Sequence, residues 1–363
     1  MNTDNKDDLE DLRSRVVKAH DSHTPLRIVG GDTKQFYANE LVGEPLYTKK
    51  HCGIITYEPS ELVMTVRSGT PLSAVQKTLA TQGQMLPFEP PVFGDGSTIG
   101  GVIASGLSGP RRPFTGSVRD YVLGCKILTG NGKVLEFGGQ VIKNVAGYDV
   151  SRIMAGAMGT LGVLLEISIK VLPKPDIEIS VYMPLTAQEA LDVMNARMAK
   201  PLPLSAACYD GETMYLRLSG TEFGLSGIER KIAGDRLDHS ELFWQELNNQ
   251  QHFFFREDVP LWRLSLASGV LHLGLPGQWF LDWGGAQRWL KTFESADNVR
   301  DAVTAEGGHA TLFRGKELLN NNEVVNMFHP LPVGLGRLTR TIKTIFDPHN
   351  ILNRHRIYGQ NAD

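Results

Sequence analysis

The chain has 363 residues, of which 41% are hydrophobic and 21% are charged, and its formal net charge at pH 7 is -3. That length allows two domains with separate cores, and the slightly acidic balance excludes the strong positive charge of a protein whose main activity is nucleic-acid binding. No run of about 18 apolar residues predicts a membrane span, and the acidic N-terminus lacks the basic and apolar regions of a signal peptide. We therefore expect a cytoplasmic protein.

The three cysteines of the chain are Cys52, Cys125 and Cys208. They are too few and too far apart for a disulfide framework, a CxxC zinc site or an iron-sulfur cluster. The ten histidines show no HxxxH or HxH spacing, so we expect no metal site. If this protein moves electrons, an organic cofactor must carry them.

The first predicted elements are a helix over Leu9–Ala19, with apolar residues at helical spacing, and a short apolar strand over Leu26–Val29. That strand runs directly into Gly30-Gly31-Asp32-Thr33. Paired glycines at the end of a strand fit an ordinary turn, and they also fit a turn that cradles a phosphate. Two strands and a helix with Thr70 as its N-cap follow, at residues 54–57, 62–67 and 70–83.

A glycine-rich run from Gly94 to Asp120 is the most distinctive stretch of the sequence. Glycine has no Cβ, so its backbone amides can approach an anion closely, and hydroxyl and guanidinium groups in the same run add donors. A flexible surface loop is the other interpretation of such a run. The apolar residues Ile99, Val102 and Ile103 favour a segment packed against a core.

The spacing of the glycines does not match the common nucleotide-binding fingerprints. Gly94, Gly96 and Gly100 are spaced GxGxxxG after a proline-rich segment, whereas the Rossmann pattern GxGxxG follows a strand directly. No Walker pattern GxxxxGK[ST] occurs. We therefore expect an anion site assembled from separated turns, at residues 30–33, 97–101, 106–117 and 159–163.

The pattern after the glycine run changes at a proline pair. Two apolar runs, 121–128 and 133–137, flank Asn131-Gly132 and predict a hairpin. A short helix capped by Asp149 and a long strand over 163–172 follow. Pro173 and Pro175 end that strand, and we place a domain boundary there.

The second half of the chain predicts a compact α+β unit. Thr186-Ala187-Gln188-Glu189 is a capping box that begins a helix after the strand 177–182. The order of elements is βαββαβ, which predicts a ferredoxin-like split unit whose last strand covers 261–266. The remaining strands and helices of this half are predicted at 205–209, 213–219, 225–233, 242–248, 278–283, 298 onward, 310–313 and 335–346.

Six short motifs occur in the order that is found in FAD-linked oxidases of the vanillyl-alcohol-oxidase type. They are GG (30–31), STIGGVIA (97–104), SVRDYVLG (117–124), KNVAGYDVSR (143–152), GTLGVLLE (159–166) and DPHNILN (347–353). The stretch 86–124 and the segments WRLSL, DWGGAQRWL and GGHAT further resemble the FAD-binding subunits of bacterial glycolate oxidases. The resemblance to the vanillyl-alcohol-oxidase type covers roughly residues 20–173 and 335–356, and the closer one extends through the cap.

This resemblance implies an α+β fold in three parts. They are a PCMH-type FAD-binding domain of two subdomains (1–173), a small ferredoxin-like cap (174–313) and a C-terminal segment that returns to the flavin (314–363). Related chains that link FAD covalently often carry a histidine just after the first glycine pair. Asp32 and Thr33 stand at that place in this sequence, so we expect non-covalent FAD.

The same resemblance implies a set of cofactor-binding residues. Backbone amides at 30–33 and 99–101 would hold the pyrophosphate, residues 159–163 would meet the adenine and ribose, and Asn353 would approach the isoalloxazine. The full implied set is Gly30, Gly31, Asp32, Thr33, Ser97, Ile99, Gly100, Gly101, Gly106, Gly116, Ser117, Asp120, Gly159, Thr160, Gly162, Val163 and Asn353.

Two functions are compatible with the resemblance. In the first, the chain is the FAD-binding subunit of a complex that oxidises glycolate, with D-lactate as a further candidate substrate, to the oxo acid. Its partners would be a homologous larger flavin subunit and an iron-sulfur subunit that receives electrons, and through them the complex could meet the inner membrane peripherally. In the second, the chain is a self-sufficient FAD-dependent 2-hydroxy-acid dehydrogenase.

No catalytic residue is assigned from the sequence. The related dehydrogenases carry a Gly-Glu-His-Gly signature, whereas this chain has Gly307-Gly308-His309-Ala310, and the missing Glu-His pair favours the subunit function. His309 could accept a proton or be structural. Arg111 and Arg112 could clamp a carboxylate, meet a flavin phosphate or be surface charges. The aromatic residues of the second half could form a docking surface or the core of the cap: Phe243, Trp244, Phe253, Phe254, Phe255, Trp262, Trp279, Trp283 and Trp289.

Overall fold

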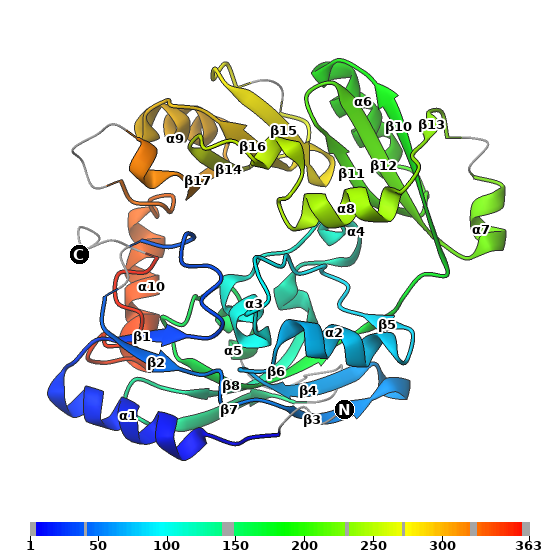
Figure 1. Cartoon of the computed structure of the whole chain (residues 1–363). Coiled ribbons are helices and arrows are strands. Elements are labelled where there is room, and N and C mark those ends of the chain that lie inside the picture. The colour runs from blue at the N-terminus through cyan, green and yellow to red at the C-terminus, as the bar shows by residue number, and fades with distance from the viewer. Residues whose placement is uncertain are drawn as a thin grey trace. The chain divides into compact units, whose positions relative to one another are not determined.

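The computed structural model describes residues 5–39, 42–139, 149–228, 232–270, 273–319 and 325–357. The chain divides into two compact units (Figure 1). Unit 1 combines 1–108, 117–174 and 330–363, and unit 2 combines 109–116 and 175–329. The main division falls after residue 174, whereas the sequence placed it after 173. Residues 143–148 of the KNVAGYDVSR motif lie outside the described residues.

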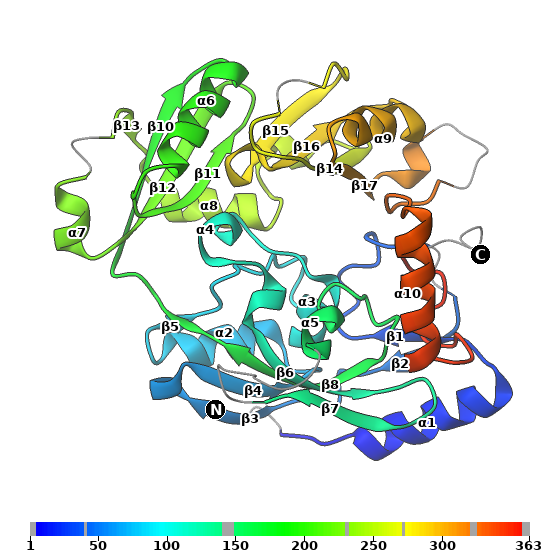
Figure 2. The same cartoon turned by 180° about the vertical axis from the view of Figure 1, so that it is seen from behind.

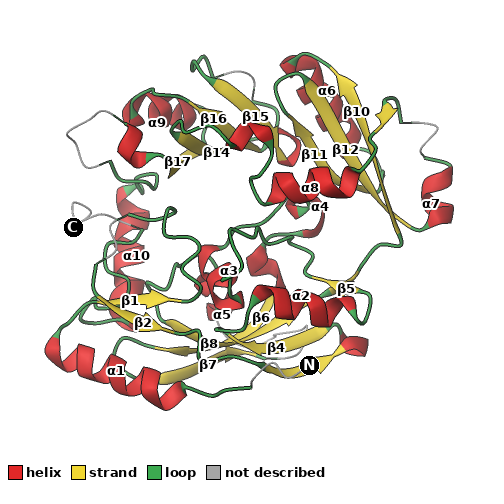
Figure 3. Ribbon diagram, viewed as in Figure 1, coloured by secondary structure: helices red, strands yellow, loops and turns green. Residues whose placement is uncertain are grey.

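Unit 1 is built on a five-stranded antiparallel sheet with the strand order β3-β4-β8-β6-β7 (Figure 3). Its strands are β3 (Ile54–Glu58), β4 (Val63–Arg67), β8 (Val163–Lys170), β6 (Val122–Leu128) and β7 (Val134–Gly138). The predicted hairpin at Asn131-Gly132 is confirmed, because β6 pairs with β7 from Gly124–Gly138 to Leu128–Val134. A two-stranded ribbon joins β5 (Gln84–Met85) to β9 (Leu172–Pro173).

Helices α2 (Leu72–Ala80), α3 (Ile99–Ser105) and α5 (Val150–Met154) cover one face of this sheet, as Figures 1 and 2 show. Leu72, Val75 and Leu79 form the buried stripe of α2. The predicted N-cap of that helix is wrong. Pro71 occupies the cap position, while the Thr70 hydroxyl donates to the carbonyl of Arg67 at 2.6 Å.

The second core of unit 1 lies against the other face of β8. Helix α1 (Leu9–Ser22) buries Leu12 and Val16 there, together with Leu165 of β8. Strand β1 (Leu26–Val29) pairs in parallel with β2 (Glu44–Tyr47). The C-terminal tail joins the same layer, since the amide of Leu26 donates to the carbonyl of Ile351 at 2.7 Å and the amide of Asn353 donates to the carbonyl of Leu26 at 2.9 Å.

A buried ion pair fixes that tail to helix α10 (Val333–Phe346). The ammonium of Lys343 lies 2.5 Å from the Asp347 carboxylate and donates to the carbonyls of Thr160 and Leu352. Asp347 also accepts hydrogen bonds from the amides of Ile351 (3.1 Å) and Leu352 (2.7 Å). The aspartate of the DPHNILN motif therefore positions the tail through hydrogen bonds within the protein.

Unit 2 is built on an eight-stranded sheet with the order β13-β10-β12-β11-β15-β16-β14-β17. Its strands are β10 (Ile177–Pro184), β11 (Leu204–Tyr209), β12 (Thr213–Gly220), β13 (Asp235–Arg236), β14 (Leu261–Ser265), β15 (Gln278–Asp282), β16 (Gln287–Lys291) and β17 (His309–Arg314). Its helices are α4 (Arg112–Thr115), α6 (Ala187–Met198), α7 (Glu222–Ser226), α8 (Ser240–Asn248) and α9 (Ala296–Ala305). The predicted capping box of α6 is confirmed, with Thr186 and Glu189 bonding each other's backbone amides.

The βαββαβ order is present in unit 2, but its last strand differs from the prediction. The elements β10, α6, β11, β12, α7 and β13 form the split unit, and β13 pairs beside β10. The strand predicted for this role, β14, instead pairs with β16 and β17 in the other half of the sheet. Two-residue strands such as β13 carry too little periodicity to be recognised in a sequence.

Most of the aromatic residues considered as a docking surface belong to the core of unit 2. Trp262 is fully buried, and Phe254, Phe255 and Phe280 contact one another edge-on or tilted. The remaining buried members are Trp244, Trp283 and Trp289. Phe253 is exposed, and Phe243 and Trp279 are partly buried, so six of the nine residues belong to the core and the set as a whole does not form a docking surface.

The segment 109–116 belongs to unit 2 because its two arginines and Gly109 are bound there. The guanidinium of Arg111 pairs with Glu178 and donates to the hydroxyl of Ser219 at 3.2 Å. Burial opposes ionisation of Glu178, but Arg217 and Arg111 outweigh it and lower the pKa of that carboxyl. Arg112 stacks 4.3 Å from the ring centroid of Trp283, whose indole N–H donates to Gly109. The surface-charge interpretation of Arg111 is therefore wrong.

No helix in the described ranges is both long and apolar enough to cross a bilayer.

Replacing Asp347 by alanine should lower the free energy of unfolding of unit 1 by about 3–5 kcal/mol, because it leaves the buried Lys343 ammonium without its counter-charge. Chemical denaturation followed by far-ultraviolet circular dichroism measures this loss. Asp149, which pairs with Arg152 where both side chains are about half exposed, is the matched control. Its alanine variant should lose at most about 1 kcal/mol, and equal losses for the two variants would contradict a structural role for the Lys343–Asp347 pair.

Candidate functional site

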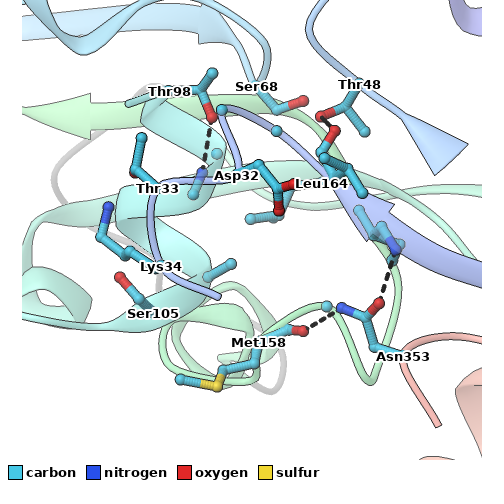
Figure 4. Close-up of a pocket in the computed structure, with 18 of the residues that line it drawn as sticks. Asp32, Thr33, Lys34, Thr48, Ser68, Thr98, Ser105, Met158, Leu164 and Asn353 are labelled. Carbon is cyan, nitrogen blue, oxygen red and sulfur yellow. Dashed lines mark hydrogen bonds between the residues drawn. The ribbon is translucent and has the colours of Figure 1, made fainter. Parts of the chain in front are cut away.

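A pocket in unit 1 lies where β1, α3, the turn at 158–162 and the C-terminal tail meet (Figure 4). It encloses about 770 Å³, part of it open to solvent. The predicted site residues that line it are Gly30, Gly31, Asp32, Thr33, Gly100, Gly101, Gly159, Gly162 and Asn353. Lining residues that were not predicted include Lys34, Thr48, Ser68, Ser105, Met158 and Arg356.

The loop that leaves β1 presents a run of free backbone donors. Within the described ranges, none of the six amides from Gly30 to Gln35 donates a hydrogen bond to the protein. Asp32 lies in the left-handed region with a φ of 58°. Successive amides around such a residue form a concave nest that binds anions. The Thr33 hydroxyl, 3.1 Å from the hydroxyl of Ser97, ties the loop to the segment before α3.

Close backbone approach explains two of the glycines around this loop. A Cβ on Gly31 would lie 1.5 Å from the carbonyl oxygen of Gly96. A Cβ on Gly100 would lie 2.7 Å from the Cβ of Ser68. Side chains at these positions would push the two turns apart, so the glycines allow them to form one wall.

The amides at the start of α3 are used within the protein. Ile99 donates to the carbonyl of Thr70 at 2.9 Å and Gly100 to the carbonyl of Ser68 at 2.8 Å. The amide of Gly101 donates to the hydroxyl of Thr98, the N-cap of α3 (3.2 Å; Figure 4). The sequence predicted that the amides of residues 99–101 hold a pyrophosphate, whereas in the structure each of them donates to an acceptor of the protein. Gly100 and Gly101 still form part of the wall.

Eight predicted residues do not line the pocket: Ser97, Ile99, Gly106, Gly116, Ser117, Asp120, Thr160 and Val163. Ile99 and Val163 are fully buried in the two cores of unit 1. Ser117 and Asp120 cap each other in a short 3-10 helix, and the two hydrogen bonds from Ser117 help to lower the pKa of Asp120 against the effect of burial.

The other non-lining residues have local structural roles. Gly106 ends α3 with a φ of 65°, and Gly116 ends α4 in unit 2. The Thr160 hydroxyl donates to the carbonyl of Ala157 at 2.7 Å, and its own carbonyl accepts from Lys343. Turn and cap glycines cannot be distinguished from ligand-contacting glycines by sequence alone, because all of them satisfy the same backbone requirement.

Asn353 joins two sides of the pocket through its side-chain amide (Figure 4). Its Oδ1 accepts from the amide of Ile28 at 2.7 Å, and its Nδ2 donates to the carbonyl of Met158 at 2.6 Å. Both ends of the amide are thus bonded to the backbone, of β1 on one side and of the 158–162 turn on the other. Gly159, with a φ of 73°, leaves room for this side chain, since its Cβ would lie 2.7 Å from Nδ2.

Two buried polar atoms of the lining have no hydrogen-bond partner in the described part of the chain, the hydroxyl of Ser68 and the Nε of Arg356. Buried polar groups are normally paired, so these two atoms are free to bond a ligand or a water molecule. Together with the free amides of the loop, they fit an anionic, oxygen-rich cofactor such as the diphosphate and ribityl portions of FAD. A set of His, Cys, Asp or Glu side chains suited to a metal ion is not found among the described residues.

His309 lies in unit 2, at the start of β17 and opposite Ser265 of β14. Its ring is 6.4 Å from that of His329, edge to face. Desolvation, followed by the guanidinium of Arg263, lowers the pKa of His309. The neutral imidazole is therefore the main form near pH 7.

Comparison with known proteins agrees with this site. The family model described as "FAD binding domain" matches residues 7–138. The chain is 42% identical to the glycolate oxidase subunit GlcE of Escherichia coli over 96% of its own length and 97% of that protein. It is 31% identical to the glycolate oxidase subunit GlcD of Bacillus subtilis, but this match covers 47% of the chain and 37% of GlcD.

Solved structures support the same fold. A 4-ethylphenol oxidase from Gulosibacter chungangensis superposes with a TM-score of 0.67 at 15% identity, covering 98% of this chain and 89% of that one. An alkyldihydroxyacetonephosphate synthase superposes with a TM-score of 0.65 at 16% identity, covering 95% of this chain and 74% of that one. The predicted fold class, a PCMH-type FAD-binding fold with mixed helix and sheet, is confirmed. Given the near full-length match, the chain belongs to the GlcE family of FAD-binding oxidoreductases, and FAD is its cofactor.

Proposed function

We propose that this chain is the FAD-carrying subunit of a heteromeric glycolate oxidase, and that its FAD is bound without a covalent link. The observation that carries the proposal is the run of six free amides from Gly30 to Gln35 at the edge of the pocket. Unpaired backbone donors cost free energy unless a ligand or water accepts from them. A diphosphate offers several anionic oxygens at the spacing that such a loop can share.

The chain's own residues bind and orient the cofactor. The loop 30–35 would hold the diphosphate, and the turn at Gly159–Gly162 would line the adenine and ribose. Asn353 acts one step away from the ligand, by keeping β1 and the 158–162 turn at a fixed separation. When bound, FAD supplies the redox chemistry for oxidation of a CH–OH donor, which protein side chains cannot supply.

A non-covalent link is supported by the composition of the lining. Among the described residues, those that line the pocket include no histidine, cysteine or tyrosine. The residue after the glycine pair is Asp32, whose carboxylate lies 3.6 Å from the guanidinium of Arg27. That carboxylate is an ion-pair partner and not a nucleophile for a flavin.

The relatives support the assignment of glycolate, with D-lactate as a further candidate. GlcE and GlcD are both glycolate oxidase subunits by name, and D-lactate dehydrogenases match part of the chain, as in Anaerostipes hadrus with 28% identity over 190 residues. We therefore propose a larger flavin subunit and an iron-sulfur subunit as partners, in a cytoplasmic complex that meets the inner membrane only peripherally. The alternative of a self-sufficient dehydrogenase is less well supported, because the Gly-Glu-His-Gly signature is missing.

Purified chain should be yellow, and acid precipitation should release all of its flavin into the supernatant as FAD. Absorbance of the supernatant and of the redissolved pellet measures the two fractions. A colourless, demonstrably folded chain that does not take up added FAD would overturn the proposal, and flavin retained in the pellet would contradict the non-covalent link.

Replacing Gly31 by alanine should weaken FAD binding roughly 10- to 100-fold, because the added Cβ overlaps the carbonyl of Gly96 and separates the loop from its neighbour. Quenching of flavin fluorescence on titration measures the affinity. Gly227→Ala is the matched control, since a Cβ there meets nothing within 4 Å. Unchanged FAD affinity in Gly31→Ala would remove the loop from the cofactor site.

The chain alone should show little glycolate-dependent dye reduction, and activity should appear on co-expression with its partners. A pull-down of the tagged chain from its native cell, followed by mass spectrometry, should recover a larger flavoprotein and a cysteine-rich protein. Robust turnover of glycolate by the purified single chain would instead establish the self-sufficient dehydrogenase.

A further inference from the structure

Lys34 is a buried lysine on the wall of the pocket. Lys34 follows the Gly30–Thr33 turn directly, and the residue is 9% exposed. Figure 4 shows it beside Thr33, on the loop that carries the free amides. A lysine ammonium is strongly hydrated, so burial of this kind needs a compensating partner.

Within the described ranges, that partner is not an anion. The ammonium of Lys34 makes no hydrogen bond or ion pair there, and its only specific neighbour is the ring of Phe93, with the centroid 5.7 Å away. Two other lysines of low exposure differ from it. Lys343 contacts Asp347, and Lys291 contacts Glu257. Lys34 thus stands apart as a buried cation whose surroundings in the protein do not neutralise it.

The other charges of the lining do not change this balance. Asp32 is the only acidic residue among the described residues of the wall, and Arg27 and Gln35 already engage its carboxylate. Arg356 adds a second cation. The wall of the pocket is therefore cationic as well as rich in free amides, which is the electrostatic requirement for a bound diphosphate.

We propose that the ammonium of Lys34 binds the diphosphate of FAD and completes, with one side chain, the cradle that the loop amides begin. This inference rests on the proposed function and assigns a cofactor-binding residue that the glycine motifs do not contain. Lys34 directly follows the Gly30–Thr33 turn and is the buried residue of this loop. Lys34 is a binding residue in this proposal and takes no part in the transfer of electrons.

The test compares Lys34→Met with wild type in titrations of the cofactor-free protein, followed by calorimetry at pH 7. The ligands are FAD, ADP-ribose, which contains the diphosphate but no flavin, and riboflavin, which contains the flavin but no phosphate. Loss of a charged hydrogen bond should weaken FAD and ADP-ribose roughly 10- to 100-fold and leave riboflavin unchanged. Lys34→Arg should keep most of the affinity, and the exposed Lys50→Met should keep all of it.

The pH dependence of binding gives a second readout. Burial lowers the pKa of Lys34 to about 8. The cofactor-free protein therefore loses this charge as the pH rises through about 8, so wild-type affinity for FAD should fall roughly tenfold from pH 7 to pH 9. Arginine stays charged over this range, so Lys34→Arg should show a much flatter profile. The other charged groups near the loop are Asp32, Arg27 and Arg356.

The outcomes separate this inference from the proposed function. Wild type that binds FAD, with Lys34→Met binding it equally well, would overturn the role of Lys34 and leave the function intact. Equal losses for riboflavin and ADP-ribose would also overturn it, because they would indicate a general disturbance of the pocket. Wild type that binds none of the three ligands would sink the function itself. If Lys34→Met does not fold, the pH profiles of wild type and Lys34→Arg decide, and identical profiles would overturn the proposal.

Discussion

The side-chain amide of Asn353 is the contact on which the pocket depends. Strand β1 and the turn at 158–162 are separated by more than a hundred residues of chain, and a residue near the C-terminus holds both through hydrogen bonds of 2.7 and 2.6 Å. Asn353 is itself held, because the tail that carries it is fixed by Asp347 and Lys343 and pairs with Leu26. The C-terminal tail therefore completes the pocket. Hydrogen bonds within the protein fix the width of the pocket without a ligand.

That rigidity matters because the loop from Gly30 to Gln35 keeps its amides unpaired. Such a loop would lower its free energy if its amides donated to nearby carbonyls, so the surrounding structure must hold it in the open conformation. Its neighbours do so at short range: Gly31 lies against Gly96, and the hydroxyl of Thr33 contacts that of Ser97. The small residues of the glycine run thus serve backbone packing first, and the free donors follow from that packing.

Elements and motifs set by neighbouring residues could largely be predicted in both units, whereas the roles of single residues could not. Hairpin β6–β7, the capping box of α6 and the Gly30–Gly31 loop follow from local rules that act over a few residues. The roles of Ile99 and Asn353 depend on hydrogen bonds to Thr70 and Met158, which are distant in sequence. A local sequence pattern does not contain such partners. The same limit explains why one glycine-rich run contributes to two units, with residues 109–116 held in unit 2 by Trp283 and Glu178.

The partners of buried cations distinguish residues that stabilise the fold from residues that can bind a ligand. Lys343, Lys291 and Arg111 each have a carboxylate of the chain beside them, so their charges are accounted for within the protein. Lys34 lacks such a partner in the described residues, and it lies on the wall of the pocket, where Arg356 adds a second cation close enough to the Asp32 carboxylate to feel its charge. An uncompensated buried cation destabilises a fold unless something of opposite charge binds there. One such cation beside a run of free amides therefore favours an anionic ligand in this pocket.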